Sequence, residues 1–374
     1  MSNVFLATIK DSIEEALAYV LQSAGRAESV KGKSVLIKPN LFEPVSYTTG
    51  QTTNPALVKA VVQWCQQQDA QEVIVGEGPS YFTPADALKE CFTKTGIADV
   101  VEQCGAQWIL FDEHHYRTYH ETSPLLPQTF RISEHAFLHD IIINVPVPKT
   151  HYLTTVSIGM KNLKGFLKRE DKPLFHRVDI NKAVVELNKI ITPFINLVDF
   201  TTSRHHRSGF ILAGSDILAA DSVSTALMGL NPHEVQTLTL GSQAGLGEIN
   251  LAKIKLDIEE GVAIKDLKMH CELPSAWLKK QFPRLTIIGH DTACSGCIIP
   301  LFSSLTQLAD QGKTFTHPLT IMLGTATPKD ELQDFLMIGD CSPHKPEHCP
   351  QVRGCPPSTH ETLKALSEHV SDKC

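Results

Sequence analysis

The sequence alternates short apolar runs with longer amphipathic segments, and this alternation constrains the fold more than any other feature. Ser34–Ile37 and Asp140–Val145 are short runs rich in apolar and β-branched residues, which predict buried strands. Amphipathic helices are predicted at Asp11–Ala24, with its first residue as the N-cap, and at Asn54–Gln67, where proline follows the capping asparagine. Strands that alternate with helices predict an α/β fold with a mostly parallel, doubly wound sheet.

A change of character near residue 280 predicts two domains. The larger, residues 1–280, carries most of the strand–helix alternation, and the smaller, residues 281–374, carries five cysteines between Cys294 and Cys355. The smaller domain is also predicted to be α/β. Its expected strands are Leu285–Gly289, Thr320–Leu323 and Phe335–Ile338, and its expected helices are Ile299–Ala309 and Ser358–His369.

Composition narrows the classes of partner and the compartment. The formal net charge of the 374 residues is -7, which gives no basic footprint for nucleic acid. The N-terminal residues lack a cationic region followed by a long apolar one, and the apolar stretches are too short to span a bilayer, so we expect a cytoplasmic protein without membrane contact. In a reducing compartment the ten cysteines are expected as buried residues, metal ligands or catalytic thiols rather than disulfides.

Four cysteines near the C-terminus form a ligand pattern. Cys294 and Cys297 make a C-x-x-C turn, Cys341 follows a predicted strand, and Cys355 is preceded by glycine and followed by two prolines. A cubane cluster takes one soft thiolate for each of its irons, so we expect these four residues to hold one [4Fe–4S] cluster. The Gly-Cys-Pro-Pro run also resembles a ligand loop in the small subunits of hydrogenases and of respiratory complex I, which implies a chemistry and not a function.

The same thiols allow other interpretations. Tetrahedral zinc also takes four cysteines, although the wide and irregular spacing disfavours it. The C-x-x-C turn alone is typical of a redox dithiol. Cys349 lies between the other ligands, where it is a fifth thiolate or a substitute for Cys341.

Polar residues follow several predicted strands, where parallel strands of one sheet bring their carboxyl ends together. We expect them to form a crevice that binds an anionic small molecule through lysine, histidine and asparagine side chains. His151 is the candidate acid–base group, because its charge changes near neutral pH. The predicted catalytic residues are His151, Lys149 and Lys161, and the predicted ligand-binding residues are Lys38, Asn40, Glu77, Asn162, Lys164, His176 and Asp199.

Several motifs in residues 30–250 resemble the family named domain of unknown function 362 (DUF362). They are Val35-Leu36-Ile37-Lys38-Pro39-Asn40, Thr53-Asn54-Pro55, Asn144-Val145-Pro146, Lys149-Thr150-His151, Gly159-Met160-Lys161-Asn162-Leu163-Lys164-Gly165, Ala219-Ala220-Asp221 and Met228-Gly229. The resemblance implies the fold and an association with iron–sulfur modules, but no established reaction. Many members carry a glycine-rich acidic stretch after the position of Asp199, and the different residues 200–209 put a shared substrate in doubt.

These features together predict an iron–sulfur oxidoreductase. Its cluster would pass electrons to the anionic ligand or cofactor in the crevice, with a redox partner protein as a further participant. One alternative is a lyase or dehydratase, in which the cluster acts as a Lewis acid. Another is a non-enzymatic electron carrier or assembly factor with a structural cluster.

Overall fold

The computed structural model describes residues 2–26, 28–81, 83–121, 124–202, 209–290, 292–327, 334–342 and 350–373. The chain forms two compact units, Met1–Cys271 and Glu272–Cys374. The predicted boundary at 280/281 falls at the end of helix α12 (Pro274–Gln281), inside the second unit.

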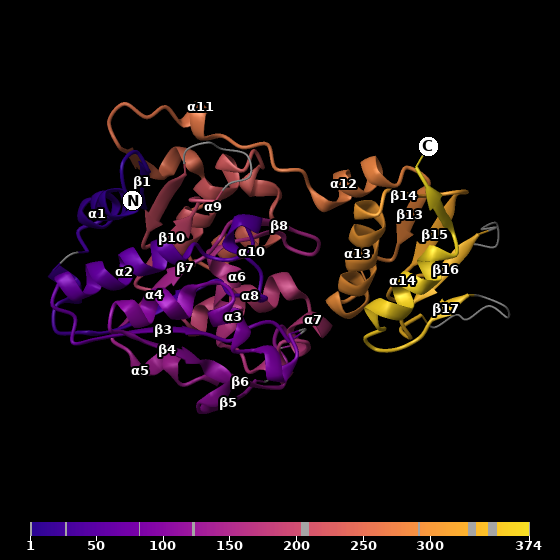
Figure 1. Ribbon diagram of the computed structural model, residues 1–374, viewed down its shortest axis with the longest axis horizontal. Coiled ribbons are helices and arrows are strands. Elements are labelled where there is room, and N and C mark those ends of the chain that lie inside the picture. The colour runs from indigo at the N-terminus through magenta and orange to yellow at the C-terminus, as the bar shows by residue number, and fades with distance from the viewer. Residues whose placement is uncertain are drawn as a thin grey trace. The chain divides into compact units, whose positions relative to one another are not determined.

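Unit 1 is built on an eight-stranded sheet (Figure 1). Its strands, in spatial order, are β12 (Lys255–Ile258), β1 (Asn3–Thr8), β11 (Phe210–Gly214), β10 (Ile195–Asp199), β7 (Ile141–Val145), β2 (Ser34–Pro39), β3 (Glu72–Glu77) and β4 (Gln107–Leu110). Strand β11 runs antiparallel to β1 and β10, and every other neighbouring pair in this sheet is parallel. The prediction of an α/β fold with a mostly parallel sheet is confirmed.

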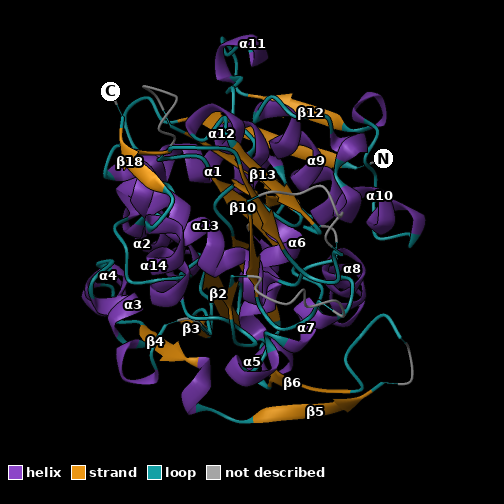
Figure 2. Cartoon of the chain, turned by 90° about the vertical axis from the view of Figure 1, so that its right-hand side faces the viewer, coloured by secondary structure: helices purple, strands orange, loops and turns teal. Residues whose placement is uncertain are grey.

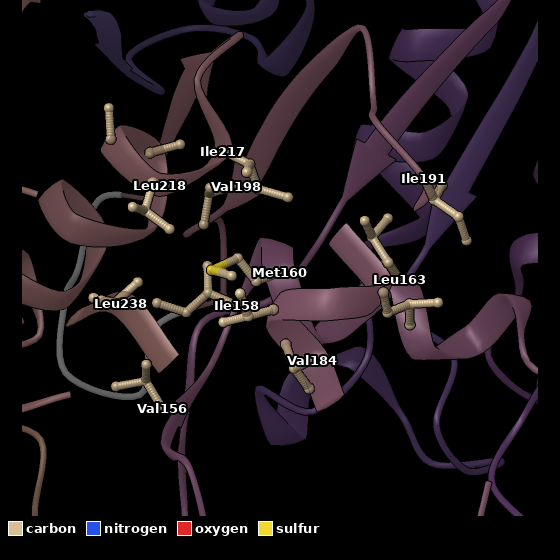
Figure 3. Packing of buried hydrophobic residues seen from close by; sticks show 14 of the residues in the cluster. Val156, Ile158, Met160, Leu163, Val184, Ile191, Val198, Ile217, Leu218 and Leu238 are labelled. Atoms are coloured by element: carbon tan, nitrogen blue, oxygen red, sulfur yellow. The ribbon is translucent and has the colours of Figure 1, made fainter. Parts of the chain in front are cut away.

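The central strands are buried on both faces, which explains their nearly continuous apolar sequence. In β2, Val35 and Ile37 belong to one hydrophobic cluster, whereas Leu36 belongs to the cluster on the opposite face. This alternation follows from the two-residue period of a strand. Figure 3 shows part of the cluster that contains Leu36. In it, Met160 lies among side chains that include Val198 and Leu218.

Helices cover both faces of this sheet. One layer contains α1 (Ile13–Ser23), α2 (Pro55–Gln67), α3 (Glu90–Thr93) and α4 (Ile97–Gln103), and the other contains α6 (Gly159–Asn162), α8 (Ile180–Ile190), α9 (Ile217–Leu227) and α10 (Gln236–Gln243). Helix α2 begins as predicted, with the Asn54 side chain accepting from Ala56 N. The predicted Asp11 cap of α1 is wrong, because the Ser12 hydroxyl accepts from Glu15 N and caps the helix instead.

Unit 1 also contains smaller elements that are not part of its main sheet. The hairpin of β5 (Tyr116–His120) and β6 (Thr129–Ser133) is a separate two-stranded ribbon (Figure 2). A second hairpin, of β8 (Lys149–His151) and β9 (Thr155–Ser157), follows β7. Short helices α5 (His135–Leu138), α7 (Leu174–Arg177) and α11 (Ile264–Leu267) complete the unit.

Unit 2 has its own four-stranded parallel sheet, in the order β13, β15, β16 and β17. These strands are β13 (Leu285–Ile288), β15 (Leu319–Met322), β16 (Phe335–Ile338) and β17 (Gln351–Val352), and β14 (Lys313–Phe315) pairs separately with β18 (Val370–Asp372). Helix α13 (Ser295–Asp310) packs beside α14 (Thr359–Ser367) (Figure 1). The predicted α/β character of this region is confirmed at the level of its strands and helices.

Among the helices of the described ranges, none combines the length and the apolar character that crossing a bilayer requires.

Candidate functional sites

Unit 1 gathers five basic side chains beyond the carboxyl end of β7. We call them the basic cluster: Lys149, His151, Lys161, Lys164 and His176. They come from three segments, namely strand β8, the helical turn 159–166 and helix α7. Each side chain is partly buried and keeps some exposure to solvent.

The β8–β9 hairpin fixes the first two members of the basic cluster. His151 Nδ1 accepts from Leu153 N at 3.1 Å and from Thr154 N at 3.3 Å. Because Nδ1 accepts, the proton of the neutral ring lies on Nε2, which is thereby a donor. The tight hairpin holds Thr155 at φ +61°, a left-handed conformation that is costly for a β-branched residue. The strained turn therefore stands next to the predicted acid–base histidine.

The helical turn 159–166 presents two lysines on one side while its apolar residues anchor it. Met160 and Leu163 are buried in the core of unit 1 (Figure 3). Lys161 and Lys164 are three residues apart and so share a face of the turn. The first backbone N–H groups of the turn, those of Gly159 and Met160, donate to the two oxygens of Asp221 at 2.8 and 2.9 Å.

Asp221 is therefore the anchor of this turn rather than a ligand contact. Burial raises the pKa of its carboxyl to about 7, while the two backbone hydrogen bonds act in the opposite direction.

The charges that act on Lys161 and His151 are all positive. Burial lowers the pKa of Lys164 to about 7 and holds the pKa of Lys161 and of His151 well below its ordinary range, and neighbouring lysines lower all three further. Among the residues that the structure describes, Lys161 Nζ has neither a hydrogen bond nor an ion pair. A desolvated ammonium group without a counter-ion is costly, so the cluster favours a bound anion.

Two further contacts define the edge of the basic cluster. Lys164 Nζ lies 2.8 Å from His176 Nε2. His176 Nδ1 is buried and has no hydrogen-bond partner in the described part of the chain. Burial, followed by the Lys164 and Lys161 charges, lowers the pKa of His176 well below its ordinary range. This ring therefore offers a polar atom that the fold itself does not satisfy.

Lys149 links the basic cluster to Asn40. Its Nζ donates to Asn40 Oδ1 and, at 2.9 Å, to the Gln51 carbonyl. Burial lowers the pKa of Lys149 to about 8, whereas the Glu77 and Glu43 carboxylates oppose the shift. The predicted residue Asn40 thus orients a lysine of the cluster, and it does so from the end of β2.

Lys38 and Glu77 form a buried pair beneath the cluster. Lys38 Nζ donates to Glu77 Oε2 at 2.5 Å, and the lysine is 0% exposed. Burial lowers the pKa of Lys38 and raises that of Glu77, while their attraction opposes both shifts. A Cβ on Gly165 would overlap Glu77 Oε1, so only glycine lets the chain cover the pair at this position. Both residues were predicted to bind ligand, which stays a prediction, and in the structure each has the other as a partner.

Asn162 belongs to a buried amide ladder that the sequence analysis missed. Asn162 Nδ2 donates to Asn144 Oδ1 at 2.8 Å, and Asn144 Nδ2 donates to Asn196 Oδ1 at 2.9 Å. Asn162 Nδ2 also lies 3.3 Å from the Pro39 carbonyl. The ladder ties the helical turn to β2, β7 and β10. An asparagine inside an otherwise apolar strand was the available signal, since a buried amide needs several hydrogen bonds.

Asp199 has a comparable internal role. Its Oδ2 accepts from Asn54 N at 2.7 Å, and its Oδ1 accepts from the backbone N and the hydroxyl of Thr201 at 2.9 and 2.6 Å. Burial raises the pKa of its carboxyl, and these hydrogen bonds oppose the shift. The predicted ligand-binding Asp199 thus holds the start of α2 at the end of β10. The neighbouring His205 and His206 lie outside the described residues.

The candidate ligand cysteines of unit 2 lie in loops at the carboxyl ends of its parallel strands. Cys294 follows β13 as the first residue before α13, Cys341 follows β16, and Cys355 follows β17. Cys297 lies in the first turn of α13 and is buried, whereas Cys341 and Cys355 are exposed. The parallel arrangement therefore brings loops that are distant in sequence to one edge of the sheet.

These four thiols lie within one another's electrostatic reach. Burial raises the pKa of Cys297 to about 12, and the Cys294, Cys341 and Cys355 thiols contribute to the shift. Burial also raises the pKa of Cys341, with further contributions from Cys355 and Cys294. A Cβ on Gly339 would clash with Cys297 Sγ, so glycine at this position leaves room for the sulfur. Four thiolates would repel one another here unless a cation neutralised them.

The thiols are not arranged around a single ion. Within the described ranges, no group of three or more His, Cys, Asp or Glu residues is close enough to hold one metal ion. A cubane differs from a lone ion because each thiolate binds a different iron, which spreads the sulfurs around a larger centre. Cys349, the predicted fifth thiolate, lies outside the described residues.

Comparisons with known proteins concern mainly unit 1. A family model described as "Domain of unknown function (DUF362)" matches residues 35–226, which include the whole basic cluster. The thylakoid-associated protein sll1697 of Synechocystis sp. is 26% identical over 230 residues, which are 58% of this chain and 69% of that protein.

A solved structure shows a weaker likeness. The lactate racemase apoprotein of Thermoanaerobacterium thermosaccharolyticum matches with a TM-score of 0.40 and 15% identity, over 55% of this chain. The match spans about half of the racemase chain, at 53% of its length.

Proposed function

Because the chain belongs to the DUF362 family, whose description assigns no reaction, we propose its function from its two candidate sites. The protein is an iron–sulfur oxidoreductase: Cys294, Cys297, Cys341 and Cys355 hold one [4Fe–4S] cluster, and the basic cluster holds an anionic substrate or cofactor. A redox partner protein supplies or removes the electrons, which pass one at a time. The name of the thylakoid-associated relative specifies neither a substrate nor a reaction.

The observation that carries the proposal is the grouping of four thiols at one edge of the unit 2 sheet. Burial and mutual repulsion disfavour four thiolates in one place, so such a group is expected where metal binding replaces the thiol protons. Soft thiolate ligands favour iron–sulfur clusters or zinc over hard ions.

The roles of the unit 1 residues follow from their contacts. Lys161 and Lys164 bind the anionic group, and Lys149 supports it from the Asn40 side. His151 Nε2, which carries the proton of the neutral ring, donates a hydrogen bond to the ligand. Lys38, Glu77, Asn162 and Asp199 hold this arrangement in place from below. The predicted crevice is thereby divided into residues that meet the ligand and residues that position them.

Cysteine variants test the metal-binding part of the proposal. Cys297→Ser and Cys355→Ser are expected to lose most of the bound iron after anaerobic purification, together with the visible absorption of the cluster. Cys104→Ser is the matched control, because Cys104 is a partly buried thiol of unit 1 outside both sites. Full iron content in both of the first two variants would count against this ligand set.

A turnover assay separates the proposed redox reaction from the two alternatives. Once a substrate is known, an oxidoreductase needs an electron donor or acceptor for every turnover. A lyase with an open iron turns over without one. A carrier or assembly factor retains its cluster but does not depend on Lys161 for its activity.

A further inference from the structure

The basic cluster differs from an ordinary lysine-rich surface on its Lys161 side, where no carboxylate among the described residues acts on Lys161 or His151. The charged groups acting on Lys161 are Lys164 and Lys149, and those acting on His151 are the same two lysines together with Lys161. The Glu77 and Glu43 carboxylates act on Lys149 at the other side of the cluster, and Glu77 also accepts from Lys38. The positive charge on the Lys161 side is left for a ligand.

The donors of the basic cluster also come from several segments of unit 1. Lys161 Nζ has all three of its N–H groups free of partners among the described residues. His151 offers Nε2, because its Nδ1 is occupied by backbone N–H groups. Lys164 stands on the same helical turn as Lys161, and His176, whose buried Nδ1 is unsatisfied, stands on α7. A ligand that satisfies donors from three segments needs acceptor atoms that point to more than one side.

From this charge and this arrangement of donors, we infer that the basic cluster binds the tetrahedral dianionic end of its ligand, a phosphoryl group, rather than a carboxylate. This inference rests on the proposed anion site and specifies its ligand class. A phosphoryl group carries about two charges and three terminal oxygens, each of which accepts hydrogen bonds. A carboxylate carries one charge on two oxygens in a plane, which leaves part of the cluster unpaired.

Binding of simple anions to the purified full chain tests the inference. The probes are inorganic phosphate, sulfate as a second tetrahedral dianion, malonate as a dianion with its charges on two carboxylates, and acetate as a monocarboxylate. Isothermal titration calorimetry is expected to give phosphate and sulfate at least about tenfold tighter binding than malonate or acetate, since each charge-assisted hydrogen bond contributes about 1.5–3 kcal/mol.

The variants place the binding at the basic cluster. Lys161→Ala and Lys164→Ala are each expected to weaken sulfate binding about tenfold or more, and Lys161→Arg is expected to recover part of the loss. Lys189→Ala is the matched control, because Lys189 is an exposed lysine of α8 that pairs with Glu186. Unchanged thermal unfolding of each variant shows that the loss of binding is local.

The outcomes distinguish this inference from the proposed function. If malonate or acetate binds as tightly as sulfate and depends on Lys161, the anion site stands and the phosphoryl class is wrong. If sulfate binds with equal affinity to Lys161→Ala and Lys164→Ala, the basic cluster is not the site and the phosphoryl assignment falls. If none of the anions binds, the anion site in the proposed function fails as well.

Discussion

Single residues decide how the basic cluster responds to pH. Burial and neighbouring cations lower the pKa of Lys164 to about 7 and of Lys149 to about 8, and hold that of Lys161 well below its ordinary value. These groups therefore give up protons more readily than free lysine does. A bound anion reverses this effect, because it stabilises the charged forms and raises each pKa. Anion binding is thus coupled to proton uptake.

The coupling predicts that affinity for sulfate falls as the pH rises. Between the pKa of a lysine in the free protein and its higher pKa in the complex, the lysine takes up a proton when the anion binds. The affinity therefore falls with each unit of rising pH in this range. We expect weaker binding by about tenfold or more from pH about 6 to about 9, a range in which sulfate keeps its charge. Calorimetry in buffers of different ionisation enthalpy measures the proton uptake directly. Affinity that does not vary with pH, without proton uptake, would contradict the assignment.

Gly165 shows how one missing side chain shapes the site. Its ideal Cβ would overlap Glu77 Oε1 and would lie 2.5 Å from Lys38 Nζ. Both atoms belong to a buried ion pair that cannot move toward solvent. The close approach of this glycine therefore brings the lysine-bearing turn over the pair.

We predict that Gly165→Ala destabilises the protein by about 3 kcal/mol, through overpacking and disruption of the buried pair. Urea unfolding measures the change. Gly105→Ala is the control, because that glycine has a positive φ but open space around its Cβ position, so it reports backbone strain without the clash. A cost for Gly165→Ala no larger than that of the control would show that the pair tolerates the extra methyl group.

At the scale of elements, the asparagine ladder joins strands and a helical turn that the backbone alone would not align. Asn144 donates to Asn196 and to the Gly159 carbonyl, and it accepts from Asn162. All three side chains are buried. Because these amides bind one another, removal of one deprives the others of a hydrogen bond.

We expect Asn144→Leu to lower the free energy of unfolding by about 3 kcal/mol, since it removes the donor to Asn196 Oδ1 and to the Gly159 carbonyl in the core. The turn that carries Lys161 should also lose its alignment, so sulfate binding should weaken. Ile142→Val in the same strand is the control, with an expected cost of about 1 kcal/mol and unchanged binding. The measurements are urea unfolding and calorimetry. An Asn144→Leu variant with the stability and the sulfate affinity of the unaltered chain would refute the ladder's role.

The elements that the sequence predicts best are those with the strongest local pattern. Strands β2 and β7 are continuous apolar runs, and α2 starts with an asparagine cap followed by proline. The β8–β9 hairpin has only three residues in each strand, several of them polar, so no two-residue period marks it. This hairpin carries Lys149 and His151, and its geometry could not be expected from the sequence.

The residue types of the candidate site could be predicted from the sequence, but not which of these residues pair with other parts of the protein. Lysines and histidines after strands indicated an anion site, because parallel strands share a carboxyl edge. No local sequence pattern shows that Lys38 pairs with Glu77, since the two residues are 39 positions apart. Likewise, the partner of Asp199 at Asn54 N is 145 positions away. Tertiary contacts of this kind decide which polar residues remain available to a ligand.

At the scale of the whole molecule, the two candidate sites belong to separate compact units. The family model matches residues 35–226 and thus the basic cluster of unit 1, whereas the cysteines lie in unit 2. A metal centre that joins loops after β13, β16 and β17 would tie unit 2 together, because metal binding contributes directly to folding.

Removal of the metal is therefore predicted to loosen unit 2 selectively. Hydrogen exchange measured by mass spectrometry should show faster exchange in peptides of 285–323 and 335–342 after chelation under air. Peptides of β2, β7 and α8 in unit 1 provide the internal control and should be unchanged. Equal loosening of both units, or of neither, would contradict a cluster confined to unit 2.

The central claim is that four cysteines of unit 2 hold one iron–sulfur cluster. Its most direct test is the analysis of iron, acid-labile sulfide and zinc in the anaerobically purified chain, combined with electron paramagnetic resonance of the reduced protein. The account predicts about four iron and four sulfide per chain, and a signal on reduction by one electron. Stoichiometric zinc without sulfide, or a metal-free chain, would contradict it.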